Sequence, residues 1–233
     1  KKPMRLTDRS FPPYISPDAL VHIVLTGDTT DSPEGSSFKA SIGSLFTSLD
    51  NAVIITGTGI NSSVRKLVNN EASGDYSAAL GGLSNSATTN YSTIVGGYKN
   101  IISGGTTSFI GGGYYNKISG NTSTIVGGCC NVVNGHRGTI NGGGYNISCV
   151  IGPGVNSGDA TVGGGYCNCA LANNSLISGG ANNKAYCDSS TIGGGQSNTV
   201  CGDKSTIAGG QGNSISGTCS FIGGGRINIS SGN

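Results

Sequence analysis

Aliphatic side chains recur at a regular interval through most of this chain, and each stands in the same short stretch of polar residues. A nine-residue frame, Ser-Thr-Ile-Val-Gly-Gly-x-x-Asn, occurs eleven times between residues 77 and 228, with copies beginning at 77, 92, 108, 123, 138, 148, 160, 175, 190, 205 and 220. Most copies start 15 or 16 residues apart. A repeat this regular predicts a solenoid to which each copy adds one coil.

The third place of the frame, counted from its first residue, predicts the core. It holds a small or branched apolar residue in every copy: Ala79, Ile94, Ile110, Ile125, Ile140, Val150, Val162, Ile177, Ile192, Ile207 and Ile222. Side chains alternate along a strand, so the first, third and fifth places share one face. Stacked coils pair their backbones about 4.8 Å apart and bury the apolar residues as a ladder, over roughly 50 Å for eleven coils.

Glycine and asparagine punctuate each copy. The fifth place is always glycine and the sixth is glycine except at Pro153, so we expect the chain to turn there, where a Cβ would obstruct a positive φ or a close backbone approach. A second short strand follows the ninth place. That place is always asparagine, which tolerates left-handed angles and can form a buried ladder of amides: Asn85, Asn100, Asn116, Asn131, Asn146, Asn156, Asn168, Asn183, Asn198, Asn213 and Asn228.

Two copies, beginning at 138 and 148, are compressed. We expect both coils to lose or shorten their second strand, which bends or narrows the solenoid. The alternative is a contact site for a partner. The complete prediction is an all-β fold: a parallel β-solenoid, or β-roll, of about 15-residue coils behind a small N-terminal β-rich module.

The first seventy residues differ from the repeats. Seven of the 13 Lys and Arg residues and seven of the 11 Asp and Glu residues lie in residues 1–71. Strands are predicted at 21–25 and 37–42, and a short helix at 44–49. Residues 53–61 resemble a degenerate first frame that starts or caps the solenoid. The predicted domains are therefore an attachment module (1–50), a transition or cap (51–75) and the solenoid (76–233).

Composition narrows the function. The formal charge is +2, and the basic residues of the repeats are scattered, which disfavours nucleic acid as a partner. No apolar run approaches the roughly 20 residues needed to span a bilayer. The glycine runs lack the lysine and serine of a phosphate loop, and the aspartates share no place in the frame, as a calcium-binding roll would require. His136 is expected to be solvated. We therefore expect no enzyme activity and no cofactor.

The eight cysteines occupy different places and form no CxxC pair, so we expect them to be small fillers and not metal ligands. A bridge between neighbouring coils would most readily join Cys187 to Cys201. Tyrosines gather beside the glycines and asparagines; packing between subunits is favoured for them over stacking on sugars: Tyr76, Tyr91, Tyr98, Tyr114, Tyr115, Tyr145, Tyr166 and Tyr186.

The frame Ser-Thr-Ile-x-Gly-Gly-x-x-Asn-x-Ile-Ser-Gly resembles the short-coil repeats in heads of trimeric autotransporter adhesins and in shafts of phage and virus tail fibres. The segments Leu20–Asp28 and Gly35–Ile42 resemble a module found ahead of such repeats in tail-fibre proteins. The resemblance implies a left-handed, homotrimeric roll. It departs from the adhesin heads in its double glycine and its many cysteines.

The resemblance implies a structural fibre or spike of a virion. Residues 1–70 would attach it to the particle, and a host-binding tip would follow Asn233. The alternatives are a cell-surface adhesin that binds glycan or matrix and a self-assembling extracellular filament. Each of the three places the chain on a virion or outside the cell.

Overall fold

The computed structural model describes residues 54–65, 69–149 and 158–232, together with the backbone of two strands nearer the N-terminus. The chain forms two compact units, Lys1–Val53 and Ile54–Asn233. In the first unit, β1 (Leu20–Leu25) and β2 (Ser36–Ser41) pair antiparallel. The two strands predicted from sequence are therefore present, each within one residue of its expected ends. The helix predicted at 44–49 lies outside the described residues.

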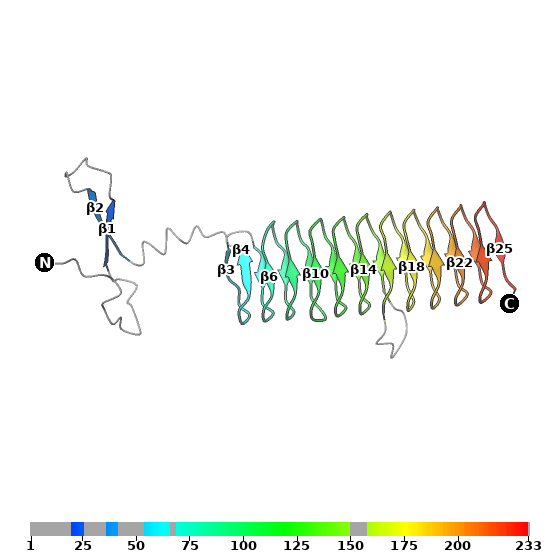
Figure 1. Ribbon diagram of the computed structural model, residues 1–233, viewed down its shortest axis with the longest axis horizontal. Helices are drawn as coiled ribbons and strands as arrows, with labels where there is room; N and C mark the ends of the chain where they lie inside the picture. The colour runs from blue at the N-terminus through cyan, green and yellow to red at the C-terminus, as the bar shows by residue number, and fades with distance from the viewer. Residues whose placement is uncertain (1–19, 26–35, 42–53, 66–68, 150–157, 233) are drawn as a thin grey trace. The chain divides into compact units, whose positions relative to one another are not determined.

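The second unit is an all-β parallel solenoid whose coils stack in sequence order along one axis (Figure 1). The predicted fold class and the coil length of about 15 residues are confirmed. Each coil gives its first strand to one sheet, which comprises β3 (Ile54–Thr56), β4 (Ser63–Arg65), β6 (Ala78–Ala79), β8 (Thr93–Ile94), β10 (Phe109–Ile110), β12 (Thr124–Ile125), β14 (Thr139–Ile140), β16 (Thr161–Val162), β18 (Leu176–Ile177), β20 (Thr191–Ile192), β22 (Thr206–Ile207) and β24 (Phe221–Ile222).

The second strand of each coil follows the asparagine and belongs to another sheet. Its members are β5 (Glu71–Ala72), β7 (Ser86–Ala87), β9 (Ile101–Ile102), β11 (Lys117–Ile118), β13 (Val132–Val133), β15 (Ile147–Ser148), β17 (Cys169–Ala170), β19 (Lys184–Ala185), β21 (Thr199–Val200), β23 (Ser214–Ile215) and β25 (Ile229–Ser230). Between the two strands, the seventh places of successive coils are joined by single parallel bridges, from Leu83 to Arg226. Each coil therefore contacts the next along three lines.

The core is two files of apolar side chains, one from each sheet. The third place supplies the first file, in which Ile94, Ile110, Ile125, Ile140, Ile177, Ile192 and Ile207 are fully buried and Ile222, in the last coil, is 9% exposed. The eleventh place supplies the second file: Ala87, Ile102, Ile118, Val133, Ala170, Ala185, Val200 and Ile215. No coil closes a core by itself, so stacking is what removes these side chains from water.

Left-handed backbone falls at three points in a regular coil: the sixth-place glycine, the eighth place and the residue that precedes the frame. In one coil these are Gly128, Cys130 and Thr122, with φ of 90°, 58° and 53°. The expectation that the ninth-place asparagine adopts these angles is wrong, because the residue before it does so. A Cβ at the sixth place would lie against the next coil, 2.1 Å from the Gly143 carbonyl oxygen when added to Gly128, whereas at Gly127 it would meet nothing within 4 Å.

The N-terminal end of the solenoid is closed by an antiparallel strand. Strand β3 pairs antiparallel with β4, and β4 then pairs parallel with β6. Residues 54–61 therefore supply a cap, which is one of the two roles expected for this segment, and the first described coil begins at Ser62. An antiparallel cap covers a strand edge that a further coil would otherwise occupy.

The copy predicted at 148 is not a coil. Strand β14 pairs directly with β16, and β15 pairs directly with β17. Ser148 is the buried eleventh-place residue of the coil that begins at Gly138, so that coil keeps its second strand, contrary to the expected loss. Val150 and Asn156 lie outside the described residues. The described solenoid thus has no coil between those that begin at Gly138 and Ala160.

Candidate functional site

The ninth-place asparagines fasten each coil to both neighbours. The Asn198 backbone N–H donates to Oδ1 of Asn183 over 3.0 Å, and Asn213 does the same to Asn198. The Asn198 amide nitrogen donates to the carbonyl oxygens of Gly194, in its own coil, and Gly210, in the next coil, each over 3.0 Å. Both sides of the amide are thus hydrogen bonded in the interior, and the glycine carbonyls at the turn are its acceptors.

This ladder has a member that the frame did not reveal. Oδ1 of Asn70 accepts the Asn85 backbone N–H over 2.8 Å, so Asn70 occupies the ninth place of the first coil. That coil lacks the glycine pair, which is why the pattern missed it. The Asn168 N–H donates to Asn146, so Asn156 does not stand between them. The remaining asparagines predicted for the ladder are joined in sequence by N–H to Oδ1 bonds of 2.9–3.1 Å: Asn85, Asn100, Asn116, Asn131, Asn146, Asn168, Asn183, Asn198, Asn213 and Asn228.

A second, interrupted ladder runs along the opposite turn, where in several coils the residue two places before the frame carries a hydrogen-bond acceptor. Here the N–H of one coil donates to the side chain of the following coil: Asp75 N–H to Asn90 Oδ1, Thr106 N–H to Asn121 Oδ1, Asn173 N–H to Asp188 Oδ1 and Asp188 N–H to Asp203 Oδ1, over 2.7–3.1 Å. The expectation that the aspartates share no place is wrong for Asp75, Asp188 and Asp203. Their role is to cap backbone N–H groups.

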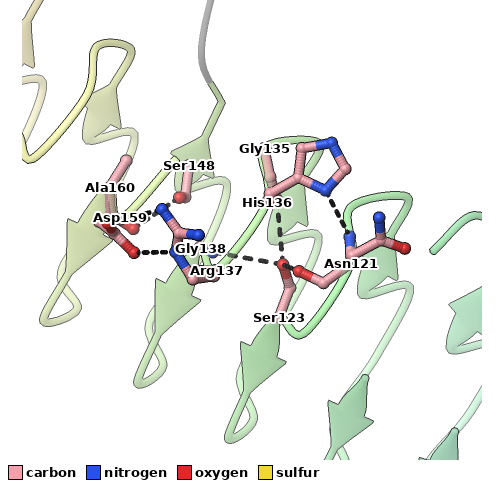
Figure 2. Close-up of polar contacts among 9 residues, drawn as sticks. All are labelled: Asn121, Ser123, Gly135, His136, Arg137, Gly138, Ser148, Asp159 and Ala160. Carbon is pink, nitrogen blue, oxygen red and sulfur yellow. Dashed lines mark hydrogen bonds and ion pairs between the residues drawn. The ribbon is translucent and has the colours of Figure 1, made fainter. Parts of the chain in front are cut away.

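His136 belongs to this second ladder. Its Nδ1 accepts the Asn121 backbone N–H over 3.3 Å, which requires Nδ1 to be the unprotonated ring nitrogen (Figure 2). The prediction that His136 is simply solvated is therefore incomplete, because the imidazole replaces an Asn or Asp side chain as a cap. The signal was its spacing of two residues before Gly138.

Beside His136, a bidentate ion pair joins the coils on either side of residues 150–157 (Figure 2). Arg137 Nε lies 2.6 Å from Asp159 Oδ1, and Arg137 Nη2 lies 3.0 Å from Oδ2. The hydrogen bond from Arg137 lowers the pKa of Asp159 below its ordinary value, and the same bond raises the pKa of Arg137. Both side chains are about half exposed, at 53% and 44%.

In the coil that begins at Gly138, the buried hydroxyl that bonds to the next coil comes from a different place in the repeat. In the preceding coil, Ser123 at the first place donates to the Gly135 carbonyl oxygen and accepts the Gly138 N–H (Figure 2). The next coil has Gly138 at the first place, where a Cβ would lie 2.7 Å from Ser148 Oγ. Ser148 then supplies the hydroxyl from the second sheet and donates to the Ala160 carbonyl oxygen over 2.8 Å. The coil that begins at Gly138 therefore keeps one hydroxyl bond to the next coil, because Ser148 supplies the hydroxyl that the first place lacks.

The turns of these two coils line a shallow hollow of about 440 Å³, bordered by Asn121, Thr122, His136 and Arg137. Its lining is polar, and the His136 Nδ1 and Arg137 guanidinium are already engaged in the contacts described above. The hollow offers hydrogen-bond donors and acceptors to a small polar ligand.

The tyrosines of the repeats occupy four places of the coil. Tyr98, Tyr114 and Tyr166 are at the seventh place, and Tyr115 and Tyr145 at the eighth. Tyr98 and Tyr114 have ring centroids 5.2 Å apart, and Tyr98 and Tyr115 5.6 Å. The Lys99 ammonium lies 5.1 Å from the Tyr98 centroid and 5.4 Å from that of Tyr115, and hydrogen bonds with Tyr98 and Tyr115 raise the Lys99 pKa. An exposed patch, called here the tyrosine–lysine patch, is formed by Tyr98, Lys99, Tyr114 and Tyr115.

The other tyrosines lie apart from this patch. Tyr76 and Tyr91 precede adjacent frames and stack with centroids 5.2 Å apart and planes 1° from parallel. Tyr186, at the twelfth place, is 42% exposed. Stacked exposed rings are compatible with both interpretations made from the sequence, packing between subunits and binding of sugars.

Cys187 and Cys201 form no disulfide; the Cys187 thiol donates to the Cys201 carbonyl oxygen in place of the predicted bridge. Among the described residues, no group of three or more His, Cys, Asp or Glu side chains is placed to hold a metal ion. The same residues contain no helix of the length and hydropathy needed to cross a bilayer.

Comparison with known proteins gives no match: no protein-family model fits this chain, and no curated protein is significantly similar to it.

Proposed function

We propose that this chain is the shaft of a fibre or spike on a virus or phage-like particle, a non-enzymatic spacer that attaches through its first seventy residues and holds a host-binding tip away from the surface. The observation that carries the proposal is the uniform fastening of the coils. Two sheets, a line of single bridges and two side-chain ladders repeat along one axis. Such a stack resists bending at every coil, which is the property a spacer needs.

Self-association of the shaft, as a homotrimer, is supported by the distribution of charge. Nine charged residues occur after position 76, and none stands at the second or fourth place, the two places that face outward from the first sheet. Apolar side chains are exposed there instead, including Val95 at 47%, Val126 at 52% and Phe221 at 69%. A long uncharged face bordered by fifth-place glycines suits close lateral contact between identical chains.

The mass of the intact chain in solution tests this proposal. Sedimentation equilibrium and light scattering should give three times the chain mass of 23.1 kDa, and electron microscopy should show a thin rod. A Val126→Glu variant should dissociate to the monomer with its β-solenoid circular dichroism retained, whereas Lys117→Glu, on the second sheet, should remain assembled. A wild-type chain that is monomeric throughout the micromolar range contradicts the shaft proposal.

A second candidate is an adhesin that binds glycan through the tyrosine–lysine patch. Tyr114 and Tyr115 are 56% and 48% exposed, and their rings lie beside a cation, so sugar faces could stack there while an acidic substituent pairs with Lys99. A glycan array compares the wild type with Tyr114→Ala. The adhesin proposal requires binding that falls at least tenfold in that variant and is unchanged in Tyr186→Ala. Equal binding by both variants excludes this patch as the glycan site.

A further inference from the structure

Two thiols converge on the side of the solenoid that carries the single bridges. Cys129 and Cys130, the single adjacent pair of cysteines in the sequence, have Sγ atoms 3.1 Å apart. Both residues are partly exposed and neither forms a disulfide. Reagents in solution can therefore reach a pair of sulfur atoms that already lie side by side.

The convergence follows from the coil and not from chance rotamers. Neighbouring side chains on an extended strand point to opposite faces. The eighth place is left-handed, with φ of 58° at Cys130, and this turns the seventh and eighth side chains toward one another. Other coils show the same proximity: the Tyr114 and Tyr115 ring centroids lie 6.3 Å apart. Backbone hydrogen bonds from Cys129 to Gly143 O and from Cys130 to Tyr114 O hold the pair in place.

Adjacent cysteines are poorly placed for a direct sulfur–sulfur bond. Consecutive Cα atoms across a trans peptide are about 3.8 Å apart, whereas disulfides usually need about 4.4–6.8 Å. A third atom that bonds to both sulfurs avoids this strain, because each sulfur keeps its distance from the other. The geometry therefore favours chelation of one atom over oxidation to a disulfide.

We propose that Cys129 and Cys130 form a dithiol site for a trivalent arsenic compound, a soft centre that takes two thiolates. An organic arsenic(III) oxide, R–As=O, reacts with the two thiols to form two As–S bonds. The two S–H protons leave with the oxide oxygen as one water molecule, and arsenic stays trivalent. No third cysteine, histidine or carboxylate group completes a cluster among the described residues, which suits an arsenic atom whose third bond is to carbon. Zinc, which needs about four ligands, would find two.

Two groups at this site have raised pKa values. The pKa of the Cys129 thiol is raised mainly by a hydrogen bond with Cys130 and secondly by burial. A hydrogen bond with Cys130 also raises the pKa of Tyr145.

The test uses the intact chain, phenylarsine oxide as the probe and glutathione in large excess. A monothiol removes arsenic from isolated cysteines but competes poorly with a chelating pair. Mass spectrometry of the wild type should show one phenylarsenic group per chain, released by dithiothreitol. Peptide mapping of the wild type should show Cys129 and Cys130 protected from N-ethylmaleimide. The Cys129→Ser and Cys130→Ser variants should each retain at least tenfold less arsenic.

The matched control is the double variant Cys167→Ser with Cys169→Ser, a pair separated by one residue, which should retain arsenic as the wild type does. The proposal is overturned if the wild type holds no arsenic in glutathione, if the protected cysteines are others, or if Cys129→Ser retains as much as the wild type. The mapping on the unaltered chain decides the matter even where a variant fails to fold.

Discussion

The Asn168 backbone N–H donates to Oδ1 of Asn146 over 3.0 Å, although 22 residues separate them. The other steps of the ladder span 15 or 16 residues and have the same geometry, such as 3.0 Å from Asn183 to Asn168. The step between these two coils therefore has the same geometry as the others, although the sequence between the two asparagines is seven residues longer. The Arg137–Asp159 ion pair and the hydrogen bond from Ser148 to Ala160 also join these two coils.

Deletion of residues 150–156 should leave the solenoid intact. The deletion restores a spacing of 15 between the two asparagines, and shortening a closed loop changes its entropy by only about 0.6 kcal/mol per twofold change in length. We expect a cooperative transition in guanidinium, followed by circular dichroism, with a free energy of unfolding within about 1 kcal/mol of the wild type.

A deletion of equal length inside a regular coil supplies the control. Removing residues 176–182 takes out β18 and the following turn, so it should abolish the cooperative transition. If the deletion of 150–156 is equally disruptive, those residues are part of the stack and the pairing described here is wrong.

Replacing Asn198 with alanine should destabilise the chain by about 3 kcal/mol. The side-chain amide donates its two hydrogens to Gly194 O and Gly210 O, with Asn183 Oδ1 as a further acceptor that shares one of them, and the side-chain oxygen accepts the Asn213 N–H. Its loss leaves several buried groups without partners, each worth about 1–3 kcal/mol before relaxation or entry of water. Chemical denaturation measures the change. Asn134→Ala, at an exposed twelfth place, should stay within about 0.5 kcal/mol of the wild type; a similar result for Asn198→Ala would contradict the ladder.

The two glycines of one turn should respond oppositely to alanine. Gly180 has φ of 86°, and a Cβ there would lie 2.1 Å from the Gly195 carbonyl oxygen. Gly180→Ala should therefore destabilise by at least about 3 kcal/mol through overpacking and backbone strain. A Cβ on Gly179 meets nothing within 4 Å, so Gly179→Ala should stabilise the isolated chain by about 0.4–1 kcal/mol.

Thermal melting of the two variants at matched low concentration checks both signs. A loss of stability at Gly179 as large as that at Gly180 would show that the fifth place is constrained within the chain itself. If self-association uses the first sheet, Gly179→Ala should in addition weaken assembly, which sedimentation measures separately.

The third-place ladder was predictable because a period of 15 combined with alternation fixes both the stacking and the buried face. Ser148, Val150 and Gly152 match the frame by local identity, so the sequence wrongly predicted a separate copy at 148. Only the pairing between coils shows that Ser148 completes the preceding coil. The fifth- and sixth-place glycines look equivalent in sequence; the distance of each to the next coil distinguishes them. His136 was missed because its acceptor role depends on a backbone N–H in another coil.

The Arg137–Asp159 pair should make stability depend on acid in a defined window. Arg137 lowers the pKa of Asp159 in the folded chain, so its contribution is complete above the unfolded value of about 3.9 and is lost as the pH falls through the folded value. Because both side chains are about half exposed, solvent screens the ion pair and its contribution to stability should be small. Asp159→Asn should therefore lower the unfolding free energy by a constant amount from pH 7 to about pH 5, and the difference from the wild type should shrink as the pH falls below about 3.9 and through the folded pKa of Asp159. Arg137→Gln should reproduce this profile. The double variant should be at most about 0.3 kcal/mol less stable than either single variant. A difference that persists unchanged at low pH would assign the effect to packing and not to the ion pair.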